Sequence, residues 1–158
     1  MKATDATTEA QGTGWRNGDL SMRPGVLIRR LHQIHTGLFL EMCGHENITP
    51  VMYSVLSCLA QNGPLDQTSI AKAVAIDRTN TTDILGRLRK RGLITSRFLA
   101  TDRRVRITTL TAEGSAVLER VDPLAEVAHS RTLDGLSETE RATFIALMAQ
   151  LTAAHKVD

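Results

Sequence analysis

A short segment between Asp77 and Arg106 carries the side chains in this sequence that are best suited to contact a nucleic acid. It holds nine arginine and lysine residues against three aspartates, a net charge of +6, whereas the whole chain carries only +2. The remaining residues therefore sum to −4. Basic charge that is concentrated in one segment predicts a contact with the phosphates of a nucleic acid.

The start of this segment resembles the reading end of a DNA-binding helix. After Asp77, which is suited to cap a helix, come five residues with hydrogen-bonding side chains: Arg78, Thr79, Asn80, Thr81 and Thr82. At the start of a recognition helix, Arg can bind guanine, Asn can bind adenine, and a Thr methyl can pack on thymine. An ordinary solvated helix start would use the same residue types, so this pattern alone leaves both interpretations open.

The end of the segment carries a second basic group. The run Thr101-Asp102-Arg103-Arg104 is predicted to lie at the tip of a hairpin, where a guanidinium can enter a narrow minor groove of DNA. Asp102 is interpreted as the partner that orients one of the two arginines through a charge-assisted hydrogen bond. The alternative is a charged, soluble turn, but the basic helix immediately before it favours a DNA-binding wing.

The elements around these residues predict a winged helix-turn-helix. A short helix opens at Asp66, and a longer one runs from Asp77 to Gly92. Their inward apolar residues are Ile70, Ala71, Val74, Ile84, Leu85 and Leu88. Two β-rich stretches, 93–99 and 104–109, then form the strands of the hairpin, with residues 100–103 at its tip.

Longer helices are predicted on both sides of this unit. The first carries one apolar stripe at alternating steps of four and three: Leu27, Leu31, Ile34, Leu38 and Met42. The next starts at Thr49-Pro50, an N-cap followed by proline. In the last third, Pro123 is expected to kink or break a helix, and Ser137 with Glu140 forms a capping box for the final one. The fold class is therefore mostly α with a small β-wing.

The run from Asp102 to Gly114, DRRVRITTLTAEG, resembles the wing and the following helix start of the MarR family of transcriptional regulators. Three upstream segments are similar to the family as well: Leu65–Ala71, Asp77–Thr82 and Leu88–Ile94. The resemblance extends from Arg23 to the C-terminus. The stretch Arg23–His35 also loosely resembles members that control the catabolism of nicotinate or related aromatic acids.

This resemblance implies a homodimeric repressor that binds a pseudo-palindromic operator in double-stranded DNA. The N-terminal sequence has no apolar stretch typical of a secretion signal, so a cytoplasmic protein is expected. It divides the chain into a flexible N-terminal arm at 1–22, a helical dimerisation region at 23–48 and 111–158, and a winged helix-turn-helix at 49–110. Residues 78–82 would then touch bases or phosphates, and Arg103 or Arg104 would enter the minor groove, braced by Asp102. Thr68, Ser69 and Arg97 would contact the DNA backbone.

The resemblance also implies a pocket for a small aromatic carboxylate that releases the repressor from DNA. His32 and His35 lie three residues apart on the first long helix, and Phe39 extends their face by four residues. With Arg29 and Tyr53 they form the expected ligand set, because imidazole and guanidinium groups can donate to a carboxylate. Histidines that simply pack at a dimer contact would give the same spacing.

Other sensing chemistries receive weaker support from the sequence. A metal site would have to combine His32 and His35 with Cys43, His45, Glu46 or His129, but no tight group of three ligands appears in the sequence. We therefore expect no metal and no cofactor. A redox switch at Cys43 or Cys58 is a further alternative, although buried, inert thiols are the simpler interpretation.

The sequence lacks the motifs that are typical of several other functional classes. Nucleophile elbow, P-loop, zinc-protease and dinucleotide-binding motifs are missing from the sequence, so no enzyme activity is expected. Aromatic residues make up only 3% of the chain, which argues against single-strand binding by base stacking. A non-specific DNA-binding or nucleoid protein remains an alternative that uses the same basic segment.

Overall fold

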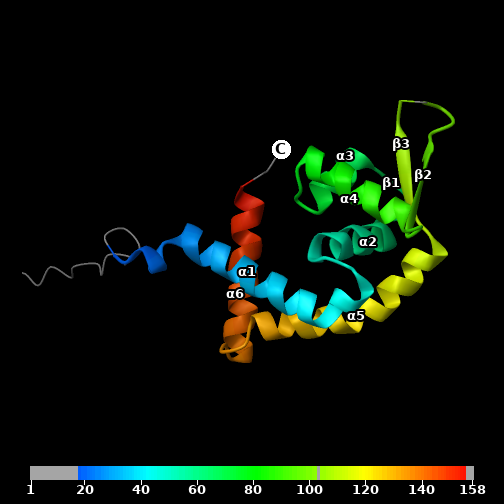
Figure 1. The fold of residues 1–158 in the computed structure, drawn as a ribbon. Helices are drawn as coiled ribbons and strands as arrows, with labels where there is room; N and C mark the ends of the chain where they lie inside the picture. Colours follow the sequence, from blue (N-terminus) through cyan, green and yellow to red (C-terminus); the bar gives the residue numbers. More distant parts are fainter. Residues whose placement is uncertain (1–17, 103, 156–158) are drawn as a thin grey trace, which may run out of the picture.

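The computed structural model describes residues 18–102 and 104–155, so Arg103 and nearly all of the predicted N-terminal arm lie outside the described residues. The chain folds into helices with one small sheet (Figure 1). In chain order the elements are η1 (Leu20–Met22), α1 (Pro24–Cys43), η2 (Gly44–Glu46), α2 (Pro50–Asn62), β1 (Leu65–Asp66), α3 (Gln67–Ala73), α4 (Arg78–Lys90), β2 (Ile94–Phe98), β3 (Arg106–Leu110), α5 (Ala112–Thr132) and α6 (Glu138–Ala154).

The predicted helix starts are confirmed by their capping bonds. The Thr49 hydroxyl accepts a hydrogen bond from the Met52 N–H at 3.3 Å, and Pro50 is the first residue of α2. At the start of α6, Ser137 and Glu140 form the expected reciprocal capping box. These local signals determine where α2 and α6 begin.

The sheet has three antiparallel strands in the order β1-β3-β2. Strands β2 and β3 form the predicted hairpin, in which Ser96 pairs with Thr108 and Phe98 with Arg106. Strand β1 was not predicted, because two residues are too few to show an alternating pattern. It pairs Leu65 with Thr108 and so ties the start of α3 to the base of the wing.

Helices α1 and α5 pack along each other, and the winged helix-turn-helix made of α2, α3, α4 and the sheet lies against one end of this pair (Figure 1). One hydrophobic core joins the two parts, with Phe39 of α1, Val55 of α2, Leu88 of α4 and Val121 of α5 fully buried in it. The reading unit therefore rests directly on the long helices.

The sequence predicted that Pro123 would kink or break a helix; helix α5 runs through Pro123 without interruption, so the proline does not break it. A proline inside a helix costs about 3 kcal/mol, because it removes a hydrogen bond and crowds the preceding turn. Val121 and Ala125, which flank Pro123, are both fully buried in the core. Their packing holds the helix together on both sides of the proline.

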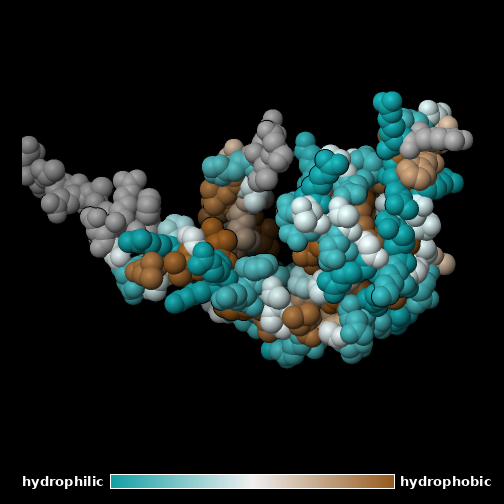
Figure 2. All heavy atoms as spheres, turned by 45° about the horizontal axis from the view of Figure 1, so that its top comes forward, coloured by the Kyte–Doolittle hydropathy of each residue, from teal (hydrophilic) through white to brown (hydrophobic). Residues whose placement is uncertain are grey.

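Apolar side chains remain uncovered on α6 and on the first half of α1. Ile145, Leu147, Met148 and Leu151 of α6 are between 40% and 61% exposed, and Ile28 and Ile34 of α1 are more than half exposed. Figure 2 shows brown side chains gathered over α6, while the head and wing are mostly teal. Among the described helices, none combines the length and the apolar character that crossing a membrane requires.

Candidate DNA-binding surface and ligand pocket

Aspartate caps fix the two helices of the helix-turn-helix. The Asp66 carboxylate accepts hydrogen bonds from the N–H groups of Thr68 and Ser69, at 2.9 and 3.0 Å, and from the Ser69 hydroxyl at 2.7 Å. Asp77 accepts from the N–H of Asn80 at 2.9 Å and also from its side-chain amide. These bonds keep the pKa of both carboxyl groups below the ordinary value. Both helix starts are therefore rigid.

The five residues predicted to read DNA do not share one environment. Arg78, Thr79, Asn80 and Thr82 are exposed on the first turns of α4. Thr81 is fully buried, and its hydroxyl donates to the Asp77 carbonyl at 2.7 Å. The Thr81 side chain is therefore not available to a base in this fold, and its burial argues against the predicted DNA contact. A period-3.6 helix necessarily turns one residue of such a run inward.

The base of the wing is joined to the recognition helix by polar contacts. The Thr108 side chain is buried, and its hydroxyl lies 3.1 Å from that of Ser96. The Arg89 guanidinium of α4 donates to the same serine hydroxyl at 3.4 Å. Because side chains alternate along a strand, Phe98 and Arg106 continue this inner face, whereas Arg97 points to the opposite one. The predicted backbone contact by Arg97 would therefore be made from the outer face of the wing.

The tip of the wing is braced through its backbone. The Asp102 carboxylate accepts a hydrogen bond from the main-chain N–H of Arg104 at 2.9 Å, which leaves the exposed Arg104 guanidinium available to a ligand. The sequence had suggested that Asp102 would orient an arginine side chain instead. Arg103, the other predicted minor-groove residue, lies outside the described residues.

A cleft of about 500 Å³ separates the helix-turn-helix from the wing. Its lining residues are Asp66, Gln67, Thr68, Ala71, Arg78, Arg104, Val105 and Arg106. Three arginines from two elements thus converge on one concave surface. Arg106 was not predicted to be a contact, although its alternation with Arg104 in the sequence placed both on one strand face; its guanidinium lies 5.6 Å from the centre of the Phe98 ring.

A second polar contact supports the reading surface. The Gln67 side-chain amide donates to the Thr82 hydroxyl at 2.6 Å, and the same hydroxyl donates to the Arg78 carbonyl at 3.0 Å. Gln67 is the first residue of α3, so this bond fixes the spacing between α3 and the first turns of α4. The sequence had offered no signal for this pairing, because the two residues are fifteen positions apart.

A cluster of rings fills the junction between α1, α2 and α5. The rings of His35 and Phe39 from α1, Tyr53 from α2 and His129 from α5 lie with neighbouring centroids between 5.0 and 6.2 Å apart. His35 Nδ1 lies 3.0 Å from the Thr132 hydroxyl, which itself donates to the Ala128 carbonyl at 2.7 Å. Nδ1 must therefore donate, which leaves Nε2 of His35 as an acceptor.

Comparisons with known proteins agree with this architecture. The sequence profile described as "MarR family" matches residues 48–105. The HTH-type transcriptional repressor NicR of Pseudomonas putida is 29% identical over 84% of each chain. The structure of BpsR from Bordetella bronchiseptica, described with the regulation of its DNA binding by 6-hydroxynicotinic acid, has a TM-score of 0.77 and is 30% identical over 81% of this chain and 97% of its own.

PcaV from Streptomyces coelicolor, solved in complex with its natural ligand, gives a TM-score of 0.80 and 32% identity, over 86% of this chain and 96% of its own. The chain belongs to the MarR family. It is a transcriptional regulator with a winged-helix DNA-binding fold, as the resemblance in its sequence implied.

In the structure of this MarR-family chain, the residues predicted to bind the effector lie in two groups. His35, Phe39 and Tyr53 meet in the ring cluster, where Phe39 is fully buried. His32 and Arg29 lie one and two turns earlier on α1, and both are exposed. Burial and the neighbouring charges of His129 and His32 lower the pKa of His35. His129 was considered only as a metal ligand, because the sequence gives no sign that it meets His35, 94 positions away.

A cleft of about 490 Å³ lies next to the ring cluster, between α2 and α5. Tyr53 and Ser57 line its α2 side, and Leu118, Asp122 and Glu126 line its α5 side. Burial raises the pKa of Tyr53, and the nearby Asp122 carboxylate raises it further, so the Tyr53 hydroxyl remains protonated near neutral pH. The polar groups at this junction can therefore both donate and accept.

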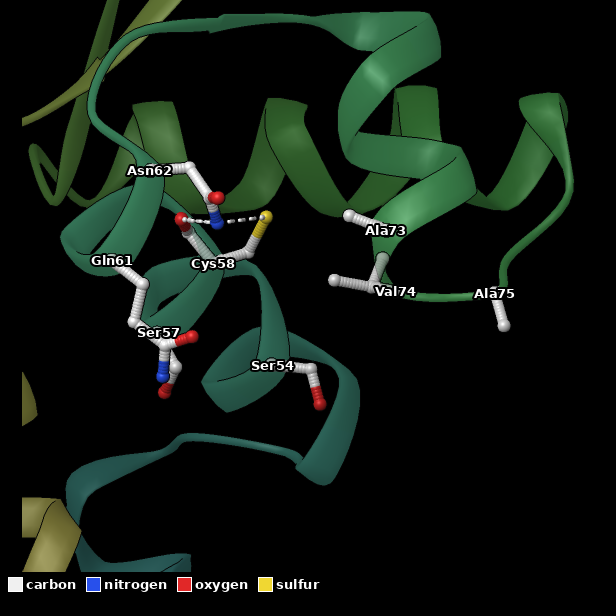
Figure 3. A pocket seen from close by; sticks show the side chains of 8 residues that line it. All are labelled: Ser54, Ser57, Cys58, Gln61, Asn62, Ala73, Val74 and Ala75. Atoms are coloured by element: carbon white, nitrogen blue, oxygen red, sulfur yellow. Dashed lines mark hydrogen bonds between the residues drawn. The ribbon is translucent and has the colours of Figure 1, made fainter. Parts of the chain in front are cut away.

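The cysteines of this MarR-family chain have little access to solvent. Cys58 lines a hollow of about 360 Å³ between α2 and the end of α3, where the Asn62 amide donates to its carbonyl at 2.9 Å and lies 3.8 Å from its sulfur (Figure 3). Cys43 is fully buried, and burial raises the pKa of its thiol. Within residues 18–102 and 104–155, His, Cys, Asp and Glu side chains form no group of three suited to a metal.

Proposed function

We propose that this MarR-family regulator is a repressor that binds a pseudo-palindromic operator as a homodimer and is released by a small aromatic acid. The arginine-lined cleft between α3, α4 and the wing carries the proposal, because Arg78, Arg104 and Arg106 converge there from two elements. Such a surface can hold a phosphate backbone between the recognition helix in the major groove and the wing in the minor groove. Residues 49–110 would be the reading head.

The dimer would be formed by residues 23–48 and 111–158. The uncovered apolar side chains of α1 and α6 support this assignment, since a monomer would leave them in water. A two-fold axis between two heads implies half-sites separated by about one turn of DNA. The operator is expected to lie on the chromosome, so the protein would act in the cytoplasm.

The effector would bind at the junction of α1, α2 and α5. The ring cluster offers an aromatic surface, Nε2 of His35 as an acceptor for a ring hydroxyl, and the Tyr53 hydroxyl as a donor. BpsR, whose DNA binding is regulated by 6-hydroxynicotinic acid, supports a hydroxylated aromatic acid as the ligand class. Arg29 would supply positive charge for its carboxylate, and His32 could donate a hydrogen bond to it.

Footprinting of the DNA that flanks its own gene tests the DNA-binding part of the proposal. On the protected duplex, we expect the double variant Arg104→Ala/Arg106→Ala to bind at least about tenfold more weakly, with a salt slope smaller by about two. Arg131→Met removes one positive charge from α5, far from the cleft, and should retain full affinity. Unchanged affinity in the double variant, or equal binding of wild type to random duplexes, would refute the proposed mode.

Addition of 6-hydroxynicotinic acid or salicylate to the complex tests the effector. One of these acids should release wild type from the operator, while His35→Ala should keep operator affinity and lose the response. A His155→Ala variant, changed outside the ring cluster, serves as the matched control. Release of His35→Ala at the wild-type acid concentration would remove His35 from the ligand site.

A further inference from the structure

Arg91, which directly follows α4, directs its side chain toward the connection between α1 and α2. It caps the C-terminus of α4, and its guanidinium donates to two main-chain carbonyls in the α1–α2 connection, Asn47 at 2.7 Å and Glu46 at 2.9 Å. Two parallel bonds from one planar group fix direction as well as distance. Arg91 therefore joins the reading helix to the long helices.

The Glu46 side chain extends this contact to α5. Its carboxylate accepts two bonds from Arg120, at 2.8 and 3.2 Å, and these bonds keep the pKa of Glu46 below its ordinary value. Glu46, Asn47, Arg91 and Arg120 thus form one continuous polar chain from α4 to α5, which we name the interdomain bridge.

The segment held by the bridge has little freedom of its own. Cys43 before it and Ile48 after it are both fully buried in the core. Asn47 adopts a left-handed backbone conformation with φ of 53°, which turns the chain from η2 toward α2. Within this turn, Arg91 contacts the carbonyls of Glu46 and Asn47.

The bridge acts at the end of α4 opposite the DNA-reading residues. Helix α4 has 13 residues, which corresponds to a length of about 20 Å, so a tilt of about 10° about its C-terminus would move Arg78 by roughly 3 Å. We propose that the interdomain bridge sets the orientation of each recognition helix relative to α1 and α5, and thereby the half-site spacing that the dimer accepts. This inference rests on the proposed operator-binding dimer.

The interdomain bridge can be tested through spacing selectivity, the preference of the dimer for one distance between half-sites over others. Fluorescence anisotropy would compare wild type, Arg91→Met and Arg120→Met on the footprinted operator, on operators with one base pair added or removed between half-sites, and on a single half-site. Wild type should prefer the native spacing by about tenfold or more. Both variants should discriminate by less than about threefold, while their affinity for the single half-site stays within about twofold of wild type.

Matched variants distinguish an effect on the orientation of the recognition helix from a general loss of protein stability. Arg131 pairs with Glu41 of α1 at 2.9 Å on the same helix as Arg120 but does not contact the head, so Arg131→Met should keep wild-type selectivity. Arg91→Lys offers a single point of donation in place of a fork and should restore only part of the selectivity. The charge exchange Glu46→Arg/Arg120→Glu should restore more of it than either single change.

Three results would overturn the inference. Full spacing selectivity in Arg91→Met would show that the bridge does not set the geometry. An equal loss of affinity on every duplex, including the half-site, would make Arg91 a DNA contact or a stability residue instead. If wild type itself showed no preference for any spacing, the proposed operator-binding dimer would fail, and the inference with it.

Discussion

His35 on α1 and His129 on α5 stack with ring centroids 5.0 Å apart and an angle of 12° between their planes. Burial, together with the neighbouring charges of His129 and His32, lowers the pKa of His35, so the folded protein disfavours a proton on this ring. Because α1 and α5 also border the proposed effector site, the charge state of His35 connects pH to the stability of the junction.

We expect the free energy of unfolding to fall as the pH is lowered below about 6.5. The pKa of His35 in the folded protein lies below its ordinary value of 6.5, so in this window the unfolded chain binds a proton that the folded one does not. The loss should level off once the pH passes the folded pKa. Urea denaturation between pH 7.5 and 5 measures it, and His35→Asn should flatten the slope while His155→Asn does not. An unchanged slope in His35→Asn would contradict the assignment.

Gly114 lies where α5 meets the wing, and we expect Gly114→Ala to destabilise the fold. A Cβ at this position would lie 2.0 Å from the Leu93 carbonyl oxygen and 2.7 Å from a Leu110 methyl carbon. Overpacking against backbone costs about 1–3 kcal/mol or more. Gly86→Ala is the control, since a Cβ there meets nothing within 4 Å and alanine favours a helix by about 0.5–1 kcal/mol. Equal melting curves for the two variants would contradict this account.

Substitutions at Thr79 and Thr81 should have different effects, one on DNA binding and the other on the stability of the fold. Thr81→Val removes a buried hydroxyl that donates to Asp77, and we expect a loss of about 1 kcal/mol in unfolding free energy with little change in operator preference. Thr79→Ala changes an exposed side chain and should leave stability intact while it weakens operator binding. Thermal denaturation and anisotropy together measure both effects. A specificity change in Thr81→Val without destabilisation would contradict the burial of this residue.

Both cysteines should react slowly with a thiol reagent in the folded protein. Cys58 is 7% exposed and Cys43 is 0% exposed, and burial also raises the pKa of Cys43, which reduces its reactive thiolate. We expect labelling of Cys58 first and of Cys43 only on unfolding, as followed by mass spectrometry. The Cys58→Ala variant should still be released from operator DNA by the aromatic acid that releases wild type. Rapid oxidation that releases operator DNA would instead support the redox alternative.

The accuracy of the sequence-based predictions depended on the range of each interaction. Capping bonds act over three residues, so Thr49, Asp77 and Ser137 marked their helix starts correctly. The meeting of His35 with His129 spans 94 positions, and no local pattern encodes it. The contact of Arg91 with the connection between α1 and α2 could likewise not be predicted, because a basic helix end in a DNA-binding segment is typical of a phosphate contact. Pro123 shows packing overriding a local signal for a helix end.

The uncovered leucines and isoleucines of α1 and α6 also affect how operator occupancy would depend on the amount of this protein. If two chains must meet before an operator can be occupied, occupancy at low abundance rises with the square of the number of chains. If growth without new synthesis halved the concentration of chains, the concentration of paired molecules would then fall by about three quarters, and transcription would resume sooner than the dilution alone suggests. The apolar face of two helices would thereby determine how sharply repression depends on protein copy number.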